Sequence, residues 1–415
     1  MRTKPSTPSK STPSKKNPAK RPAHEQQQPA PTIPEQKDSQ EEKTRQQTLL
    51  DVFSTAFRDV LHSPDFTTRL QEVKTALYNR DFEAAFAHES ALAVYAARWS
   101  PTRALCYGHI LRELDAHLKT LITASGPPGS NGEGAAGSDN DDPNPTTDPA
   151  PSHPQVSASE TKDTTPEGTP DQRTLKVLSI GGAAAELVAV ADYIASTKSQ
   201  SQSQSQPQTT TTTITPEITL LDIAPWTPTI KALTKTLTTP PARSPLHPTD
   251  KPPLLPTPFH PRVSQTNILT ADVKAVLSAA SGPGNPAVLI TLLFTLNELY
   301  TTSGTKPTTT FLRALTAHAP PGSLLLVVDS PGSYAETAVG KEGRRYPMQW
   351  LLHHTLVPPS GSQSGSEGEE EKRARWERIE SHDSIWFRVA EGLRYPIPLE
   401  NMRYQLHLYR ANTGS

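Results

Sequence analysis

The second half of the chain predicts an α/β fold, in which a mostly parallel sheet carries helices on both faces. Between residues 175 and 356, five short apolar runs are each followed by a helical pattern, and this alternation is typical of parallel, doubly wound sheets. Runs such as LLLVV at 324–328 are apolar throughout, as expected for strands buried on both faces. The last two runs, at 384–391 and 402–410, have no helical pattern between them. They predict an antiparallel pair that brings the sheet to seven strands.

Composition indicates that this fold does not fill the chain. The 415 residues include 43 prolines, and only 34% of them are hydrophobic, which is too polar for one continuous globule. The net charge of −1 singles out no class of partner. The single cysteine, Cys106, excludes a disulfide framework and a cysteine-built zinc site, and no metal is expected. No apolar run approaches the ~20 residues of a transmembrane helix, so we expect a soluble, intracellular protein with no membrane partner.

Residues 1–45 are expected to be a disordered basic tail. The first 21 residues contain seven Lys and Arg and no acidic residue. Such a block is typical of a nuclear address or a nucleic-acid-binding arm. A tail that only adds solubility is the alternative.

Residues 46–122 are predicted to form a separate helical domain. Apolar residues recur at helical spacing in three segments, 49–61, 66–77 and 82–99. Ser100 and Pro101 then have the pattern of a helix start, with a serine cap followed by proline at the first helical position. A new helix is therefore expected from Ser100 to about Ile122.

Four segments rich in Pro, Gly, Ser, Thr or Gln cannot bury a core and are predicted to be disordered. They are the linker at 123–172 and the insertions at 199–213, 238–261 and 358–372. The α/β domain is assigned to 173–411, around these insertions.

The five strand-and-helix units are placed by their apolar runs and by the helical patterns that follow. The strands are predicted at 175–180, 218–223, 266–269, 287–296 and 323–329. The helices are predicted to run through Ile194 and through Leu237, over Val273–Ala280, around Phe311–Leu315 and over Gln349–Leu356.

Two glycines, Gly181 and Gly182, directly follow the first strand. In an open parallel sheet, ligands bind beyond the carboxyl ends of the strands, near the point where the strand order reverses. The dinucleotide pattern G-x-G-x-x-G is absent, and alanines at 183–185 stand where its later glycines would bring a pyrophosphate against the helix. S-adenosylmethionine has no phosphate and needs less of such a cradle. The loop therefore suits this cofactor, with an ordinary tight turn as the alternative.

Acidic residues follow three further strands. Asp222 ends the second strand, where an acid would hydrogen-bond ribose hydroxyls or stand in water. Its distance in sequence from the glycine loop is about twice the usual ~20 residues, and the insertion at 199–213 explains most of the difference. Asp272 follows the third strand, where it could hold an adenine amino group or, equally well, cap the next helix. Asn297 and Glu298 end the fourth strand, on the side where chemistry would occur, although Glu298 could simply favour a helix start.

Several blocks of the chain resemble one family. They are RWSPTRALCYGHI (98–110), LSIGGAAAEL (178–187), LLDIAPW (220–226), LITLLFTLNELY (289–300), LVVDSPGSY (326–334), YPMQWLLHHTL (346–356) and ENMRYQLHLYR (400–410). In this order, over about residues 47–411, they are similar to the fungal large-subunit (25S) ribosomal RNA uridine-N3-methyltransferases. The glycine loop is common to many methyltransferases, whereas the blocks around Tyr334, Trp350 and Tyr404 are more specific.

The resemblance implies a seven-strand, Rossmann-like, S-adenosylmethionine-dependent enzyme that methylates N3 of a uridine in ribosomal RNA. It implies that Gly181, Gly182, Glu186 and Asp222 contact the cofactor. Its partner would be ribosomal RNA or a pre-ribosomal particle. We expect a monomer located in the nucleus and the nucleolus.

Methylation of a uridine ring nitrogen requires removal of a weakly acidic N–H and in-line attack on the sulfonium methyl group. Asn297 could hydrogen-bond the uracil, and Glu298 could accept its proton. Asp329, at the end of the fifth strand, would border the same pocket. These three residues are the catalytic candidates.

The base must leave its stack to reach a pocket, where aromatic side chains would hold it. Tyr334, Trp350 and Trp386 are candidates for this contact, with core packing as the alternative for the two tryptophans. Basic residues that could hold phosphates, or form a solvated charged face, are Arg344, Arg345 and the run Lys372–Arg378.

Two other functions stay open at this point. One is a catalytically silent ribosome-assembly factor that has kept the fold. The other is a methyltransferase that acts on a protein or a small molecule, and the basic block near the N-terminus favours an RNA-related role over it.

Overall fold

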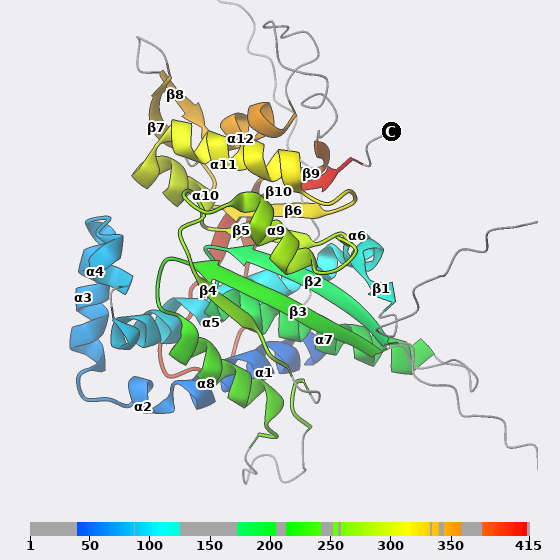
Figure 1. Ribbon diagram of the computed structural model, residues 1–415. Helices are drawn as coiled ribbons and strands as arrows, with labels where there is room; N and C mark the ends of the chain where they lie inside the picture. Colours follow the sequence, from blue (N-terminus) through cyan, green and yellow to red (C-terminus); the bar gives the residue numbers. More distant parts are fainter. Residues whose placement is uncertain are drawn as a thin grey trace, which may run out of the picture. The chain divides into compact units, whose positions relative to one another are not determined.

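Seven strands lie side by side in one sheet of the computed structural model (Figure 1). Across the sheet their order is β4 (Arg262–Gln265), β3 (Thr213–Asp222), β2 (Gln172–Ile180), β5 (Leu289–Leu293), β6 (Leu324–Asp329), β10 (Met402–Ala411) and β9 (Trp376–Phe387). The pairs from β4 to β6 are parallel, and β10 is antiparallel to both of its neighbours. A two-residue strand, β1 (Thr123–Ala124), adds to the start of β2. The predicted fold class, including the antiparallel closing pair, is confirmed.

The structure describes residues 40–86, 88–124, 172–204, 213–241, 252–255, 259–332, 334–339, 344–357 and 376–412. The predictions of disorder for most of the tail, for most of the linker at 123–172 and for the insertion at 358–372 lie outside these residues. Among the helices within them, none is both long and apolar enough to cross a membrane.

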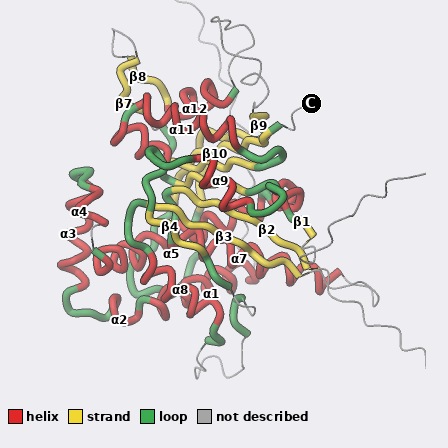
Figure 2. The backbone as a smooth tube through the Cα atoms, viewed as in Figure 1, coloured by secondary structure: helices red, strands yellow, loops and turns green. Residues whose placement is uncertain are grey.

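Alternate residues of the strands face two separate hydrophobic cores, because side chains alternate across a strand. In β2, Val177 belongs to one core and Leu178 to the other. The first core is covered by α1 (Gln40–Ala56), α5 (Glu89–Glu113), α7 (Ala184–Gln204) and α8 (Thr227–Thr238). The second is covered by α9 (Val273–Ser281), α11 (Thr305–His318) and α12 (Met348–Leu356). Figure 2 shows these helices on either side of the sheet.

The helix α7 is buried on all sides. From Ala184 to Thr197, every side chain except that of Ala195 is buried, because the sheet covers one side of α7 and α5 covers the other. The two helices approach closely at Gly108, where a Cβ atom would come within 2.7 Å of Asp192 Oδ2. A helix that is apolar nearly all round requires such a double cover.

A buried ion pair fastens α5 to α7. The Arg112 guanidinium donates to Asp192, whose side chain is 2% exposed, and to Glu42 of α1 at 2.8 Å. Arg45 of α1 lies 3.9 Å from the same aspartate. Burial raises the pKa of Asp192 to about 6, against the lowering effect of Arg112 and Arg45. Residues of three helices therefore contact or approach one carboxylate that is shielded from solvent.

The N-terminal helices do not form a separate domain. Residues from α1, α5, α7 and the sheet share one core, and Gln40–Ser415 form a single compact unit. The shorter helices of this region are α2 (Arg58–Leu61), α3 (Phe66–Tyr78), α4 (Phe82–Phe86), α6 (Asp115–Leu118) and the 3₁₀ turn η1 (Lys119–Leu121). The prediction of a separate domain is wrong because the apolar residues that would form the core of an independent helical domain pack against α7 instead.

The first helix begins at Gln40, inside the segment that was assigned to the tail. The residues at its start are polar, but they are used in packing. Glu42 bonds to Arg112, and Gln46 is buried and accepts a hydrogen bond from the Ala390 backbone at 3.2 Å. The polar sequence had hidden these contacts.

The helix α5 runs without interruption through Pro101, so the predicted helix start at Ser100 is wrong. Proline lacks the N–H that would bond the carbonyl group four residues earlier, which here belongs to Ala97. The hydroxyl of Tyr395, in the loop between β9 and β10, donates to that carbonyl at 2.6 Å. A side chain from the far end of the sequence thus replaces the missing backbone bond.

Both edge strands were misplaced in the sequence. The third strand is Arg262–Gln265 and not 266–269, and β9 begins at Trp376, well before the predicted 384. Both carry exposed polar residues, because an edge strand pairs on one side only and shows a weak apolar signal.

Three of the tracts predicted to be disordered contain ordered residues. In the linker at 123–172 these are β1 and the first residue of β2, Gln172. The helix α7 extends to Gln204, into the insertion at 199–213. Within 238–261, Leu255 and Phe259 are buried in the first core, and the Leu255 N–H bonds the Leu237 carbonyl at 3.0 Å. These isolated apolar residues anchor part of the proline-rich tract.

Replacing Arg112 with Met should lower the free energy of unfolding by about 3–5 kcal/mol, because a buried carboxylate loses its main partner. Urea unfolding measures the loss. The control Arg98→Met removes another guanidinium of α5, but its partner Glu400 is 69% exposed, so a loss below about 1 kcal/mol is expected. Equal losses in the two variants would contradict the importance given to the buried pair.

Candidate active site

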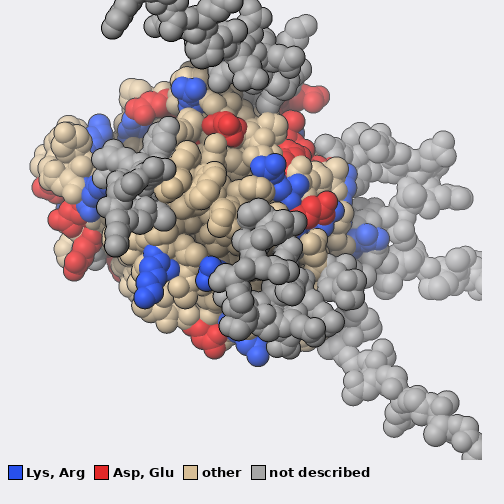
Figure 3. Space-filling view, turned by 90° about the horizontal axis from the view of Figure 1, so that it is seen from above, with Lys and Arg blue, Asp and Glu red and all other residues tan. Residues whose placement is uncertain are grey.

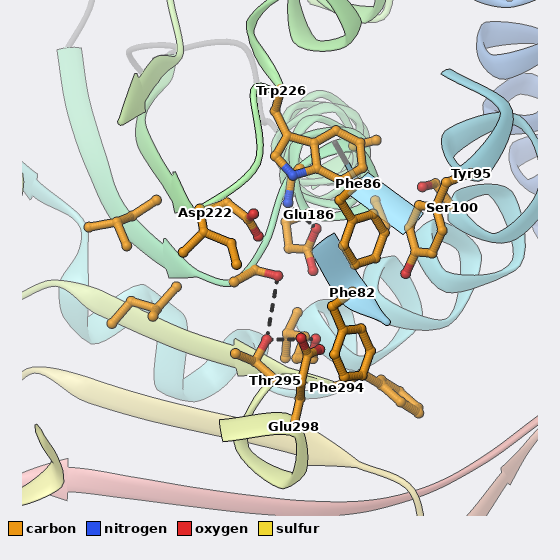
Figure 4. A pocket seen from close by; sticks show the side chains of 18 of the residues that line it. Phe82, Phe86, Tyr95, Ser100, Glu186, Asp222, Trp226, Phe294, Thr295 and Glu298 are labelled. Atoms are coloured by element: carbon orange, nitrogen blue, oxygen red, sulfur yellow. Dashed lines mark hydrogen bonds between the residues drawn. The ribbon is translucent and has the colours of Figure 1, made fainter. Parts of the chain in front are cut away.

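A cavity of about 350 Å³ lies at the carboxyl ends of β2, β3 and β5, where open parallel sheets bind their ligands. Its inner wall consists of residues from the loops after these strands, including Gly181, Glu186, Asp222, Asn267, Thr295 and Glu298. Its outer wall comes from α3, α4 and α5, with Phe82, Phe86, Tyr95, Trp99 and Arg103. Figure 4 shows the acidic side chains facing a space that aromatic rings close on one side.

Gly181 and Gly182 form a turn that has no room for side chains. Gly181 has a φ of +69°, and a Cβ atom there would lie 2.3 Å from Thr295 Cγ2. A Cβ atom on Gly182 would lie 2.1 Å from Ser179 Oγ. The Gly181 N–H also bonds the Leu221 carbonyl at the end of β3, at 2.8 Å. The backbone of the turn is therefore fixed between two strand ends, at the edge of the cavity.

Glu186, in the first turn of α7, folds back onto the glycine turn. Its Oε2 accepts a hydrogen bond from the Ala183 N–H at 2.7 Å, and the residue is only 7% exposed. Burial raises its pKa to about 7, against the effect of backbone hydrogen bonds and of Arg103. Glu186 thus lines the cavity, as the resemblance implies, and also holds the turn in place.

Asp222 lies at the end of β3 and lines the cavity. Its Oδ1 accepts a hydrogen bond from the Ala224 N–H at 2.8 Å. Burial raises its pKa, against the lowering effect of the hydrogen bond from Ala224. Asp222 therefore lies at the strand end beside the glycine turn, as predicted.

Glu298 ends the short helix α10 (Leu296–Glu298), which follows β5 and leads into the π-helical turn η2 (Leu299–Ser303). It lines the same cavity. Burial raises its pKa to about 7, and the negative charge of Asp222 adds to the rise while Arg103 opposes it. Glu298 is thus close to its midpoint of ionisation at neutral pH.

Asn297 and Asp329 do not face the cavity, in contrast to the prediction that they act in catalysis. Asp329 is 2% exposed, and its carboxylate accepts hydrogen bonds from the N–H groups of Asn297 at 2.9 Å and Ser330 at 2.7 Å. Neither residue belongs to the cavity lining. Successive residues of a helical turn point in different directions, so Glu298 enters the cavity while its neighbour binds β6.

Asp272 caps α9 instead of lining the cavity. Its carboxylate accepts hydrogen bonds from Lys274 N at 3.0 Å and from Ala275 N at 3.2 Å, and the residue is exposed. Because the third strand ends at Gln265, the residues directly after it, Thr266–Ile268, occupy the cavity wall. The misplaced strand therefore led to the wrong acid.

Two of the predicted aromatic contacts to the substrate, Trp350 and Trp386, lie outside the cavity. Trp350 is 46% exposed and stacks between Tyr346 and His354, with ring centroids 4.7 and 5.0 Å apart. Trp386 is 55% exposed and lies under the guanidinium of Arg403. Core packing, the alternative for both tryptophans, is wrong.

Three other predicted substrate residues are located only by their backbone. Tyr334 begins β7 (Tyr334–Val339), and Arg344 and Arg345 begin β8 (Arg344–Pro347); the two strands pair as a hairpin. Their side chains lie outside the described part of the chain, as do residues 372–375 of the basic run.

None of the aromatic residues of the outer wall was predicted to line a site. Phe82 and Phe86 stack with ring centroids 6.4 Å apart, and Tyr95 lies 5.0 Å from Phe86 and from Trp99. The signal was available in the sequence, because aromatic residues four apart lie on one face of a helix. It was assigned to a helical core, since nothing local indicates that these helices reach the carboxyl ends of the strands.

Gly181→Ala should destabilise the fold more than Gly332→Ala. Both glycines have positive φ, +69° and +73°, but nothing lies within 4 Å of a Cβ atom on Gly332. Gly332→Ala should therefore cost only the backbone penalty of about 1–2 kcal/mol. Gly181→Ala should add about 1–3 kcal/mol for the collision with Thr295. Urea unfolding of both variants checks the difference, and equal costs would refute the close contact.

Comparisons with known proteins point to one family of enzymes. A family model described as "Putative SAM-dependent methyltransferase" matches residues 53–410. The 25S rRNA (uridine(2843)-N(3))-methyltransferase of Saccharomyces cerevisiae is 27% identical over 385 residues, which cover 88% of this chain and 86% of that protein.

Solved structures give weaker likenesses. A SAM-dependent methyltransferase from Methanosarcina mazei is 10% identical over 57% of this chain and 92% of its own, with a TM-score of 0.29. The antibiotic-resistance methyltransferase Kmr is 12% identical over 58% of this chain and 88% of its own, with a TM-score of 0.26. These scores are too low to support an argument. The family model, by contrast, spans most of the sequence, and the chain belongs to the family of S-adenosylmethionine-dependent methyltransferases.

Proposed function

We propose that this methyltransferase transfers a methyl group from S-adenosylmethionine to N3 of a uridine in large-subunit ribosomal RNA. The observation that carries the proposal is a single cavity in which the glycine turn, Asp222 and Glu298 come together (Figure 4). The name of the yeast relative supports uridine N3 as the acceptor atom.

The cavity suits S-adenosylmethionine in shape and in charge. Gly181 is exposed and lines the cavity, whereas Gly182 is buried behind it. Asp222 ends β3, where an acid accepts hydrogen bonds from ribose hydroxyls. The cofactor carries positive charges on its sulfonium and ammonium groups. The cavity lining contains three carboxylates, those of Glu186, Asp222 and Glu298, and their pKa values are all raised by burial. A bound cation relieves such crowding of like charges.

The bound cofactor supplies an electrophilic methyl group, and the residues of this chain orient and deprotonate the acceptor. Glu298 takes the proton from N3. The electron pair left on N3 then forms the bond to the methyl carbon while the carbon–sulfur bond breaks and leaves its electron pair on sulfur, so that S-adenosylhomocysteine is the leaving group. A pKa near 7 makes Glu298 a stronger base than an exposed carboxylate and leaves it largely ionised at slightly alkaline pH. The walls of the cavity restrict the relative motion of the two reactants, which is the main contribution of the protein to such a transfer.

We place the acceptor uracil against the outer wall of the cavity. Phe82, Phe86 and Tyr95 line it, and aromatic rings stack on bases that have left a helix or loop. Trp350, being exposed and stacked with its neighbours, stays a candidate for an RNA contact outside the cavity. The roles of Tyr334, Arg344 and Arg345 toward RNA stay predictions.

The proposed cellular partner is ribosomal RNA or a pre-ribosomal particle, and the proposed location is the nucleus and nucleolus. On the face seen in Figure 3, the described Lys and Arg residues are scattered among Asp and Glu. We therefore assign long-range attraction to RNA to the basic block within residues 1–21. We further propose that the enzyme acts as a monomer.

Asp222→Ala should lower the affinity for S-adenosylmethionine about 5- to 150-fold, because a buried ribose hydroxyl loses its acceptor. Isothermal titration calorimetry measures the change. Asp272→Ala is the matched control, since Asp272 caps α9 at the surface, and it should bind the cofactor like the wild type. The reverse result would show that the cofactor lies elsewhere.

Glu298→Gln should lower turnover about 10²- to 10⁴-fold, as expected for loss of a general base, and leave the affinity for S-adenosylmethionine nearly unchanged. In the wild type, kcat/KM should rise with pH through about 7, because only the ionised carboxylate accepts a proton; Glu298→Gln should lose this dependence. Mass spectrometry of nucleosides from treated ribosomal RNA measures 3-methyluridine.

An equal loss of cofactor affinity would make Glu298 a cofactor ligand. A wild type that binds the cofactor but forms no 3-methyluridine would refute the proposed acceptor and favour the silent assembly factor.

A further inference from the structure

One guanidinium lies in the wall of a cavity that is otherwise rich in acids. Arg103, on α5, lines the cavity together with Glu186, Asp222 and Glu298. Its side chain lies over two aromatic rings, with Cζ 5.3 Å from the centroid of Phe294 and 5.6 Å from that of Tyr95. These two contacts hold the flat face of the guanidinium and leave its N–H edge for hydrogen bonding.

Arg103 lacks an anionic partner within the described part of the chain. Its one hydrogen bond there is to the Tyr95 hydroxyl, which is neutral, since burial raises its pKa. A guanidinium has five N–H donors, so most of them stay available. Arg103 also lowers the pKa values of Glu186 and Glu298, although neither carboxylate is within ion-pair distance. A partly buried cation held in this way is suited to an anionic ligand that enters the cavity.

We propose that Arg103 binds the carboxylate group of the methionine moiety of S-adenosylmethionine. This inference rests on the proposed cofactor site. The cofactor has one negative group, its carboxylate, and two positive groups. Asp222 matches the ribose and Glu186 a positive group of the cofactor, and Arg103 is the cation in the described lining that matches the carboxylate. Planar, paired recognition of a carboxylate is the contact for which a guanidinium is best suited.

The position of Arg103 agrees with this role. Phe294, which it covers, directly follows β5 and has a positive φ of 59°, and the next residue, Thr295, touches the glycine turn. The Arg103 guanidinium thus lies close to the glycine turn beside the proposed cofactor site. It extends to this place from α5, which precedes the strands of the sheet in the sequence. An N-terminal helix would in this way complete the cofactor site.

The test compares two ligands that differ by one group. S-adenosylhomocysteine carries the carboxylate, and its decarboxylated analogue lacks only that group. By isothermal titration calorimetry, the wild type should bind S-adenosylhomocysteine about 10- to 150-fold more tightly than the analogue, as expected for a charge-assisted hydrogen bond. Arg103→Gln should bind the two ligands with nearly equal affinity, and Arg103→Lys should keep part of the preference.

Arg98→Gln is the matched control, because Arg98 lies on the same helix but pairs with the exposed Glu400. It should keep the full preference for the carboxylate. If Arg103→Gln weakens both ligands equally, or weakens neither and lowers only methyl transfer, the guanidinium serves another group and the inference is wrong. If the variant does not fold, the wild type alone decides, since equal affinity for the two ligands overturns the inference. Failure of the wild type to bind S-adenosylhomocysteine at all would instead overturn the proposed cofactor site.

Discussion

The burial of α7 on both of its sides is the constraint on which the rest of the structure depends. This helix starts at the glycine turn and runs along the sheet, and its outer side is as apolar as its inner side. It must be covered twice, and α5 provides the second cover through close packing at Gly108 and the Arg112–Asp192 pair. The same α5 carries Tyr95, Trp99 and Arg103 past the start of α7. The outer wall of the cavity is thus a consequence of covering a helix.

The charges of the cavity are unbalanced, and this imbalance explains the chemistry that we assign to it. Glu186, Asp222 and Glu298 line one cavity, and burial raises the pKa of all three carboxyl groups. The positive charge of Arg103 partly offsets their negative charges. Such a site favours a cationic ligand and keeps one carboxylate basic enough to take a proton. Glu186 is committed to the loop by its bond to Ala183, and for this reason we propose Glu298, and not Glu186, as the base.

The sequence was most informative where physical signals are local. The continuous apolar runs of β2, β5 and β6 predicted a parallel sheet, and Gly181, Asp222 and Glu298 were found because they lie at or shortly after the ends of strands. Errors arose where partners are remote in the sequence. Asp329 looked catalytic because it ends a strand, but its carboxylate accepts a hydrogen bond from a backbone N–H of α10. The aromatic outer wall was missed because its position depends on how α4 and α5 cross the sheet, and no local pattern encodes that crossing.

The bond from Tyr395 to the Ala97 carbonyl connects two segments that are synthesised at different times. The proline in α5 leaves this acceptor open, and the residue that closes it belongs to the loop before the last strand. Gln47 and the Arg394 backbone exchange two further hydrogen bonds between the same loop and α1. During translation, the wall of the cavity therefore reaches its final packing only after Arg394 and Tyr395 have left the ribosome. A truncated product that lacks its C-terminal segment would possess every residue of the cofactor pocket and still lack the bonds that keep α5 in register.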